Sequence, residues 1–381
     1  MSESLGKTPG RSAFLRLNSL AYERLLRPVI FRSSAQAAHE RMYRWLRRAD
    51  AFPWPMDIAR WLAAKPEPVT CGGVMLNSPL ILAAGLVKGD GFESEAAALD
   101  AVERGKNIIP GWRSLPRLVG AVEFGSFTRW PRLGNPGTVV WRDVSTHSTQ
   151  NRVGLRNPGA RAAAAFLGRH APDLPHVFGI NIAVSPGVDD PAQQTSEVLE
   201  SVAAFIDRGV YPTWFTLNLS CPNTEDDPRG HQTADAAQQA CGATVDFLAS
   251  QNGHDIPLWV KVGPNLGDEQ YRALMNVFDS TGVRAVVATN TLPMPAPGAA
   301  SLQAGVGGGQ LHDRAIAVAA LLMNEKRTHG YQLDIIGCGG VEDGSTYQDF
   351  ARLGIAVVHY WTALIYRGPL ASAIIHHEAH S

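Results

Sequence analysis

The sequence has few cysteines, and their spacing offers neither a metal site nor a disulfide framework. The four cysteines among 381 residues are Cys71, Cys221, Cys241 and Cys338, and no two of them form a CxxC pair. Reduced thiols in a cytosolic setting fit this pattern best, and no metal site is expected. No apolar run approaches the roughly 20 residues of a membrane-spanning helix. Residues 1–12 are polar with no apolar core after them, so no secretory signal is expected.

The sequence also lacks an excess of charge of either sign. The formal net charge is −1, which gives no indication of a nucleic-acid partner. Hydrophobic residues make up 45% of the chain, enough for a full core. The length suits one large α/β domain with additions, or two domains.

Short apolar segments alternate with helical ones from residue 79 onward. The predicted strands lie near 80–84, 121–125, 178–182, 214–219, 257–262, 284–289, 334–337 and 355–359. Eight strands separated by helices predict an α/β fold of the (β/α)8 TIM barrel type. A doubly wound sheet would carry GxGxxG after its first strand, and the turn at 85–91 lacks that motif.

The N-terminal part has a different character. Residues 1–10 are expected to be a tail, and residues 14–49 to form two amphipathic helices, the first ending before Pro28 and the second opening with a capping box of Ser33 and Gln36. Arginines crowd their polar sides. Such helices either lie on an anionic membrane surface or pack on their own domain with a solvated arginine face.

The predicted organisation has three parts. Residues 1–52 form the tail and the helical extension, residues 53–78 a linker and a segment at the bottom of the barrel, and residues 79–381 the barrel. The linker is expected because residues 53–68 are rich in proline.

The stretch from Thr216 to Thr224 is the best candidate for the chemistry. It starts as a strand and breaks at Pro222, directly after Cys221, with the amides of Asn218 and Asn223 on either side. Ligands bind at the C-terminal ends of barrel strands, so a reactive cysteine is expected here. A buried structural cysteine in a polar turn is the alternative.

Polar residues and glycines collect at the other predicted strand ends as well. Backbone N–H groups of Gly339 and Gly340 and the hydroxyl of Thr362 predict a phosphate site, and Lys88 and Lys261 add positive charge. A phosphate-bearing cofactor is therefore expected. The residues at these ends are Lys88, Ser126, Thr128, Asn181, Lys261, Thr289, Asn290, Thr291, Gly339, Gly340, Trp361 and Thr362.

These motifs resemble dihydroorotate dehydrogenase, the FMN enzyme family of pyrimidine biosynthesis. The resemblance runs from about residue 20 to the C-terminus, and its N-terminal helices are similar to those of the membrane-associated, quinone-using class 2 branch, where they form a tunnel for quinone. The matching segments are 82–88, 124–128, 151–155, 179–182, 218–224, 260–262, 288–291, 336–340, 361–364 and 367–369.

The resemblance implies a role for each matching residue. Cys221 would be the catalytic base, Thr224 would help relay its proton through water, and Lys88 would serve both substrate and flavin. FMN would be held by Ala84, Gly85, Lys88, Ser126, Asn181, Asn218, Lys261, Thr289, Gly339, Gly340, Trp361 and Thr362. The dihydroorotate-like substrate would be held by Lys88, Asn151, Val153, Gly154, Leu155, Asn218, Asn223, Asn290 and Thr291.

The resemblance also implies partners and a location. Besides the substrate, the partners would be quinone and a membrane surface. The protein would be peripheral on the cytoplasmic face of the inner membrane of a bacterial-type cell, or cytoplasmic.

Several positions depart from the family pattern and keep other functions open. Class 2 members have serine where this chain has Cys221, and a cysteine there is typical of the soluble class 1 branch. The family pattern also has aspartate at Val87, phenylalanine at Leu155 and tyrosine at Trp361. The turn at 308–314 and the segment 103–118 are longer than the family needs. A divergent paralogue acting on another ring and a flavin-free barrel scaffold are the alternatives. A tRNA dihydrouridine synthase is disfavoured, because the chain lacks a basic C-terminal domain.

Overall fold

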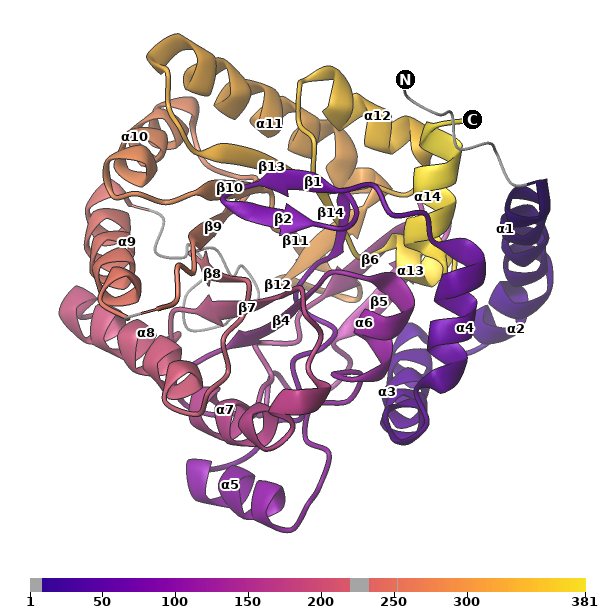
Figure 1. The fold of residues 1–381 in the computed structure, drawn as a ribbon, viewed down its shortest axis with the longest axis horizontal. Coiled ribbons are helices and arrows are strands. Elements are labelled where there is room, and N and C mark those ends of the chain that lie inside the picture. The colour runs from indigo at the N-terminus through magenta and orange to yellow at the C-terminus, as the bar shows by residue number, and fades with distance from the viewer. Residues whose placement is uncertain (1–8, 220–232, 252) are drawn as a thin grey trace.

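A closed barrel of eight parallel strands forms the centre of the molecule (Figure 1). The computed structural model describes residues 9–219, 233–251 and 253–381. Each barrel strand overlaps one of the predicted strands, so the predicted (β/α)8 barrel is confirmed. In order around the barrel the strands are β3 (Leu80–Leu82), β4 (Val122–Phe127), β7 (Phe178–Ala183), β8 (Trp214–Asn218), β9 (Leu258–Val262), β10 (Ala285–Ala288), β13 (Asp334–Cys338) and β14 (Val358–Tyr360).

Helices cover the outside of the barrel (Figure 1). Among the described residues, no helix is both long and apolar enough to cross a membrane. The helices that follow the barrel strands are α5 (Glu95–Glu103), α6 (Ser114–Val119), α7 (Ala160–Arg169), α8 (Pro191–Ile206), α9 (Ala234–Ala249), α10 (Asp268–Ser280), α11 (Gly309–His329), α12 (Gly344–Arg352), α13 (Ala363–Tyr366) and α14 (Ala371–Ala379), with a 3-10 turn at Ala171–Asp173.

A short antiparallel hairpin, β1 (Val69–Cys71) and β2 (Val74–Leu76), closes the N-terminal end of the barrel. Its turn is fixed by two hydrogen bonds, because the Trp259 indole donates to the Gly72 carbonyl over 2.9 Å and the Gly72 N–H donates to Asp334 over 2.8 Å. Gly72 has a φ of +57°, and a Cβ there would lie 2.4 Å from the Trp259 ring nitrogen. Only glycine allows this close approach.

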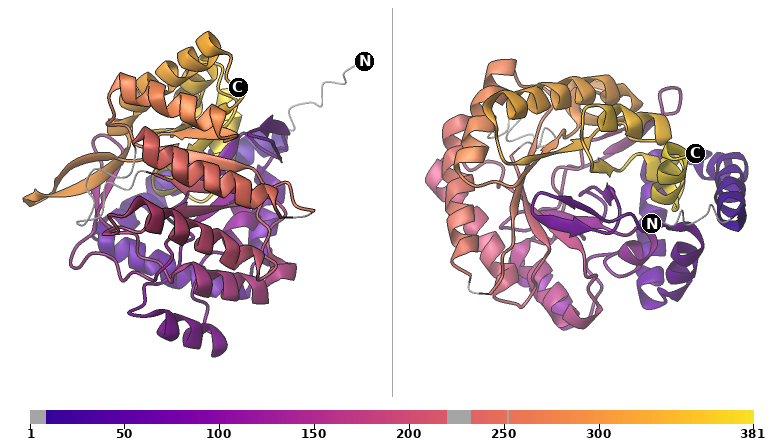
Figure 2. Two further views of the ribbon diagram at one scale, coloured as in Figure 1. Left: turned by 90° about the vertical axis from the view of Figure 1, so that its left-hand side faces the viewer. Right: turned by 45° about the horizontal axis from the view of Figure 1, so that its top comes forward.

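A second, four-stranded antiparallel sheet was not predicted from the sequence. Its strands, in the order β11 (Leu292–Ala296), β12 (Ala299–Gly308), β6 (Ser148–Asn151) and β5 (Val140–Asp143), come from two insertions far apart in the chain. In the left view of Figure 2, the orange β11–β12 hairpin projects from the barrel. The sheet brings Asn151 beside Gly305 of β12.

The N-terminal extension packs against one side of the barrel, next to the C-terminal helix (Figures 1 and 2). Its elements are α1 (Pro9–Ala21), a π-helical turn at Tyr22–Leu26, α2 (Arg27–Phe31), α3 (Ala35–Ala51) and α4 (Trp54–Ala63). The amphipathic helices are present, but the first does not end before Pro28. It continues through a π-helical turn, and Pro28 occupies the first turn of α2, where a backbone N–H is not required.

Two other local predictions were wrong. The side chain of Ser34, not Ser33, caps α3 by accepting from the Ala37 N–H, whereas Ser33 bonds to Ile30 and Arg41. Residues 54–63 of the expected linker form α4, whose Pro55 again lies in the first turn. The prolines there start a helix instead of preventing one.

Asp50 at the end of α3 ties the extension to the barrel. Its buried carboxylate accepts hydrogen bonds from the backbone N–H groups of Gly111 (2.7 Å) and Ser114 (2.9 Å) and from the Asn107 amide (2.8 Å). These donors lie at and just before the start of α6, so Asp50 satisfies groups that the helix leaves unpaired. Deleting the whole extension would therefore damage the barrel as well.

Candidate functional site

One pocket at the C-terminal ends of the barrel strands gathers the predicted site residues that the structure describes. It contains all of the residues predicted to hold the cofactor and every described residue predicted to hold the substrate; Cys221, Asn223 and Thr224 lie outside the described residues. The predicted residues that line it are Ala84, Gly85, Lys88, Ser126, Asn151, Val153, Gly154, Leu155, Asn181, Asn218, Lys261, Thr289, Asn290, Thr291, Gly339, Gly340, Trp361 and Thr362.

Amide groups converge on one corner of this pocket. The Asn290 amide donates to the Asn218 side-chain oxygen, and the Asn218 amide donates to the Ser126 hydroxyl, each over 3.4 Å. The Asn290 side-chain oxygen accepts from the backbone N–H of Thr291 over 2.8 Å. This chain of hydrogen bonds orients donors and acceptors toward a ligand edged with amide groups.

The segment after β6 forms another wall. Leu155 is buried and has a φ of +53°, a left-handed conformation that is unusual for a bulky residue. The Asn157 amide holds it there by donating to the Leu155 carbonyl over 2.7 Å. A residue held in this way at the pocket wall is typical of a functional segment.

Glycines and hydroxyls line the end of the pocket expected to hold a phosphate. The hydroxyls of Thr149 and Thr362 lie 3.1 Å apart, beside Gly307 and Gly308. The start of α11 also faces this end through Gly308 and Leu311. The N–H groups of Gly309 and Gln310 are already bonded, to the His147 carbonyl (3.4 Å) and the Ser148 hydroxyl (3.0 Å). An anion at this end would therefore be favoured by the positive end of the helix dipole and by later N–H groups of the first turn.

His312, within the segment 308–314 that departs from the family pattern, is not among the residues that line the pocket. Its ring bonds to the Gly339 carbonyl over 3.1 Å and lies 2.8 Å from Asp349, and Asp313 is exposed. The residues predicted to form a longer turn at 308–314 include the first turn of α11, starting at Gly309.

Three ionisable side chains that face the barrel interior lie at or below the pocket floor. Glu123 is fully buried and accepts from the Asn181 amide (3.0 Å), the Trp214 indole (3.2 Å) and the Thr216 hydroxyl. Lys261 and His359 line the pocket itself. Sequence reasoning identified Lys261 but missed Glu123 and His359, because a lone charged residue in a strand carries no signal of its position.

These groups shift one another's pKa. Burial opposes ionisation of Glu123, yet the nearby charges of His359 and Lys261 and the hydrogen bonds from Thr216 and Trp214 lower its pKa. Burial lowers the pKa of His359 to about 4, against the attraction of Glu123. At neutral pH the floor therefore holds an ionised glutamate and a neutral histidine.

We expect His359 to make the protein less stable as the pH falls. Its pKa is about 4 when folded and about 6.5 when unfolded, so the unfolded chain binds the proton first and folding loses about 2 kcal/mol between pH 7 and pH 5. His359→Gln should remove this part of the slope in chemical denaturation series at the two pH values. Equal slopes in both proteins would contradict the assignment.

Helix α3 of the extension reaches the same pocket. His39 lines it and lies with its ring centroid 4.8 Å from that of Tyr43, whose hydroxyl donates to the Leu86 carbonyl over 2.8 Å. Burial, then the charges of Lys88 and Arg156, lower the pKa of His39 to about 4. A neutral imidazole from the extension thus contacts the pocket, which sequence reasoning did not anticipate.

The pocket contains buried polar atoms that have no partner among the described residues. They include the Asn181 side-chain oxygen, the Thr291 hydroxyl and both ring nitrogens of His359. Unpaired buried polar groups cost free energy, so their gathering in one pocket fits a polar ligand. The amide corner, the two lysines and the anion-favouring end together match the donors and acceptors of FMN.

The family model described as dihydroorotate dehydrogenase matches residues 68–381, most of the chain. This chain belongs to the dihydroorotate dehydrogenase family. The relative from Bordetella avium, named dihydroorotate dehydrogenase (quinone), is 32% identical over 358 residues, covering 91% of this chain and 93% of that protein. The relative of the same name from Salinispora arenicola is 31% identical over 362 residues, covering 92% of this chain and 96% of that protein.

Solved structures of the family share the fold. The crystal structure of DHODH from Eimeria tenella in complex with ferulenol aligns with a TM-score of 0.71 and 24% identity, covering 92% of this chain and 93% of that one. The ligand-free form aligns with a TM-score of 0.68 and 23% identity. At this identity the likeness supports the fold alone. At 92% coverage, the alignment with the ferulenol complex includes at least part of the chain before the barrel.

Proposed function

We propose that the chain oxidises dihydroorotate to orotate with FMN and passes the electrons to quinone. The observation that supports this proposal is the pocket at the barrel's C-terminal end, where amides, two lysines and an anion-favouring end converge. The relatives at about 30% identity named for the quinone-dependent activity support it. FMN, when bound, supplies the two-electron chemistry that no amino-acid side chain can provide.

We assign the substrate and the cofactor phosphate to different residues of the pocket. Asn151, Asn218 and Asn290 with Thr291 match the ring amides of the substrate, and a site built this way rejects analogues that lack them. Lys88 supplies positive charge for the substrate carboxylate. Gly339, Gly340 and Thr362, beside the start of α11, hold the cofactor phosphate.

The direct test is anaerobic mixing of the FMN-loaded protein with dihydroorotate while the flavin absorbance is followed. Bleaching by dihydroorotate, followed by recovery on adding quinone, is the expected result. A yellow protein that dihydroorotate does not bleach would favour the divergent paralogue, for which Leu155 and Val87 are the specific observations. A protein that neither carries nor takes up FMN would favour the scaffold.

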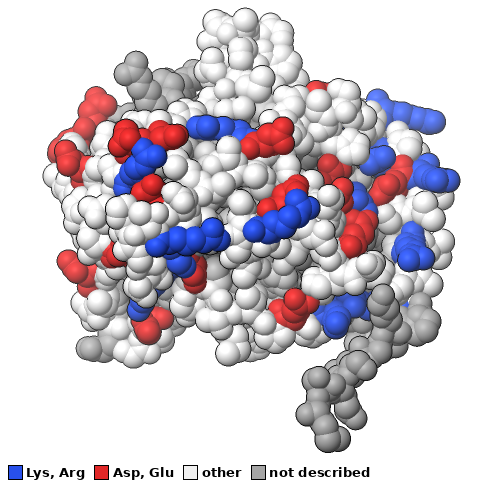
Figure 3. Space-filling view, turned by 90° about the horizontal axis from the view of Figure 1, so that it is seen from above, with Lys and Arg blue, Asp and Glu red and all other residues white. Residues whose placement is uncertain are grey.

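The extension is proposed to deliver quinone from a membrane surface. Most of the large apolar side chains exposed on the described part of the chain lie there, between residues 17 and 62: Leu17, Leu20, Leu25, Leu26, Val29, Ile30, Trp45, Phe52, Trp54, Ile58, Trp61 and Leu62. Basic side chains line the right-hand edge of Figure 3, on the side of the N-terminal helices. Apolar groups with basic neighbours favour an anionic lipid surface.

Not every arginine of the extension faces outward as predicted. Arg47 pairs with the buried Asp90 carboxylate over 2.5 Å, and Arg27 donates to the Tyr366 carbonyl over 3.0 Å. Arg16, Arg24 and Arg44 are exposed, so their side chains are available to contact lipid headgroups. The extension is thus both packed on the barrel and exposed on its other side.

A charged residue placed on the exposed apolar surface of the extension should weaken membrane binding without changing flavin reduction by the substrate. Trp61, with 81% of its surface exposed, is changed to glutamate, and Met75, 71% exposed on the β1–β2 hairpin, is changed likewise as the control. Trp61→Glu is expected to weaken binding to anionic vesicles by about tenfold, as for loss of a buried aromatic group, and to slow turnover with long-tailed quinone.

Flavin reduction by dihydroorotate should stay unchanged in both variants. Vesicle binding should also weaken as salt rises, because headgroup contacts are screened. If Met75→Glu weakens vesicle binding as much as Trp61→Glu, the helices are only a structural part of the domain.

Leu155→Phe should improve dihydroorotate oxidation. The leucine stands where the family pattern has an aromatic wall, and regained ring contacts are expected to strengthen dihydroorotate binding by about 1–2 kcal/mol. The measurement is the KM for dihydroorotate in steady state. A higher KM would mean that the native substrate is larger than dihydroorotate.

A further inference from the structure

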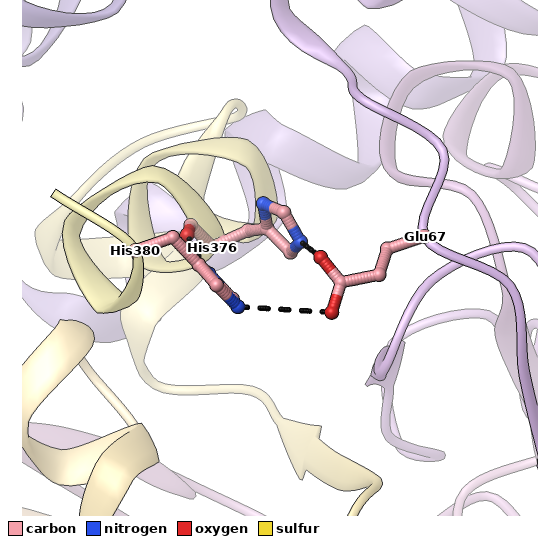
Figure 4. Close-up of side chains that lie close together, drawn as sticks. All are labelled: Glu67, His376 and His380. Atoms are coloured by element: carbon pink, nitrogen blue, oxygen red, sulfur yellow. Dashed lines mark hydrogen bonds and ion pairs between the residues drawn. The ribbon is translucent and has the colours of Figure 1, made fainter. Parts of the chain in front are cut away.

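We propose that Glu67, His376 and His380 form a binding site for a divalent transition-metal ion, with Zn²⁺ the best match. The site lies outside the barrel pocket, where the C-terminal helix α14 meets the segment before β1 (Figure 4). One possible ligand atom from each residue lies within 4.8 Å of the others. Two imidazoles and a carboxylate are a set that zinc commonly accepts.

The spacing of the ligand atoms fits one ion after small side-chain movements. The Nε2 atom of His376 donates a hydrogen bond to one Glu67 carboxylate oxygen over 2.7 Å, so a metal would have to displace that proton and widen the contact, and the Nε2 atom of His380 lies 3.6 Å from the other oxygen. Ligands at the zinc distance of about 2.1 Å in a tetrahedron lie roughly 3.4 Å apart. His376 lies on α14 and His380 directly follows its last residue, Ala379, and the two ring centroids lie 4.6 Å apart.

The hydrogen bond of His380 occupies Nδ1 and leaves Nε2 available to bind a metal. Its Nδ1 lies 2.8 Å from the His376 carbonyl, and since a carbonyl only accepts, Nδ1 carries the proton. In the neutral ring, Nε2 then presents a lone pair toward the Glu67 carboxylate at 3.6 Å, beyond hydrogen-bond range. A backbone carbonyl that fixes the other ring nitrogen is typical of histidine ligands.

Both sides of the site are held in place without a metal. The Glu67 N–H donates to the Asn77 carbonyl over 3.0 Å, which fixes the segment before β1. The Gln348 amide donates to the Ala379 carbonyl over 2.9 Å, which fixes the end of α14 on α12. The half-exposed side chains of Glu67 and His380 leave room for a water ligand and a path for the ion.

The ion would tie α14 to the segment that joins the extension to the barrel. It would therefore stabilise the folded protein without entering the reaction.

The test is calorimetric titration of Zn²⁺ into the full-length, FMN-loaded protein after chelator dialysis. One equivalent is expected to bind, and at about 100 times the dissociation constant the Tm should rise by about 3 °C. His380→Ala should weaken this binding by about 100-fold. Glu67→Gln should do the same, and both side chains are half-exposed, so folding should be kept.

His377→Ala is the matched control, because His377 is on the same helix but outside the cluster. It should bind Zn²⁺ as the unaltered protein does, and Co²⁺ substitution should give visible absorption bands that His380→Ala abolishes. Absence of stoichiometric Zn²⁺ binding would leave the three residues as an ordinary ion-paired cluster. Equal affinity in His380→Ala would place the ion elsewhere, and either result overturns the proposal.

Discussion

Cys221→Ala is expected to slow flavin reduction by dihydroorotate by about two to four orders of magnitude while FMN stays bound. Oxidation of the dihydropyrimidine removes a proton and a hydride from adjacent carbons, and the proton needs a base. A thiol with an ordinary pKa of about 8.5 ionises far nearer to working pH than a serine hydroxyl. Cys221 follows β8 by three residues, and Asn218 at the end of β8 lines the pocket.

The measurement is anaerobic stopped-flow spectroscopy over a range of pH. The rate should rise with pH as the thiol ionises, and Cys221→Ser should keep partial activity with its inflection moved upward. Cys241→Ala is the matched control, because Cys241 is buried on α9 away from the pocket.

One other thiol competes for this role. Cys338 lines the pocket, and its sulfur lies 3.5 Å from the Lys261 amine. A larger loss in Cys338→Ala than in Cys221→Ala would make Cys338 the base. Near-normal flavin reduction in both variants would mean that the proton goes to another group or to water.

The barrel was predictable because its signals are local and repeated. Each strand is a short apolar run that ends at polar residues, and the parallel topology then brings all eight ends together. This is why residues as distant as Lys88, Asn218 and Thr362 could be predicted to share one site, as the structure finds. Their separate roles toward FMN and substrate remain predictions.

The errors came from prolines and from contacts between distant segments. Pro28 and Pro55 lie in first helical turns, where the sequence pattern alone does not distinguish a helix start from a break. The four-stranded sheet pairs β6 with β12, about 150 residues apart, so neither strand carries a strong local signal. His39 reaches the pocket because α3 is fixed on the barrel by contacts such as those of Asp50 and Tyr43, which join segments distant in the chain.

The role of Glu123 inside the barrel also could not be predicted from the sequence. In sequence it is one charged residue in an apolar strand, which favours a strand end or an edge. In the structure it is the centre of a hydrogen-bonded floor that also contains Thr216 and Trp214. The charge of Lys261 helps lower its pKa, so the two residues act on each other across the barrel.

Lys261→Met is expected to lower the midpoint potential of the bound flavin by about 50 mV, equivalent to losing one charged hydrogen bond. The lysine lines the pocket and supplies positive charge where reduction adds negative charge. Flavin reduction should slow by about 100-fold, since charge-assisted contacts that strengthen during the reaction have effects of this size. Spectroelectrochemical titration measures the potential independently of turnover.

Loss of Lys261 should also leave Glu123 as a buried charge without its cation and destabilise the fold by about 3 kcal/mol. The double variant Glu123→Gln/Lys261→Met separates the two effects, because removing the carboxylate charge should recover most of the stability and leave the potential low. If the double variant recovers the potential together with the stability, Lys261 acts only through the packing of the barrel floor. If Lys261→Met alone leaves the potential unchanged, its charge does not act on the flavin.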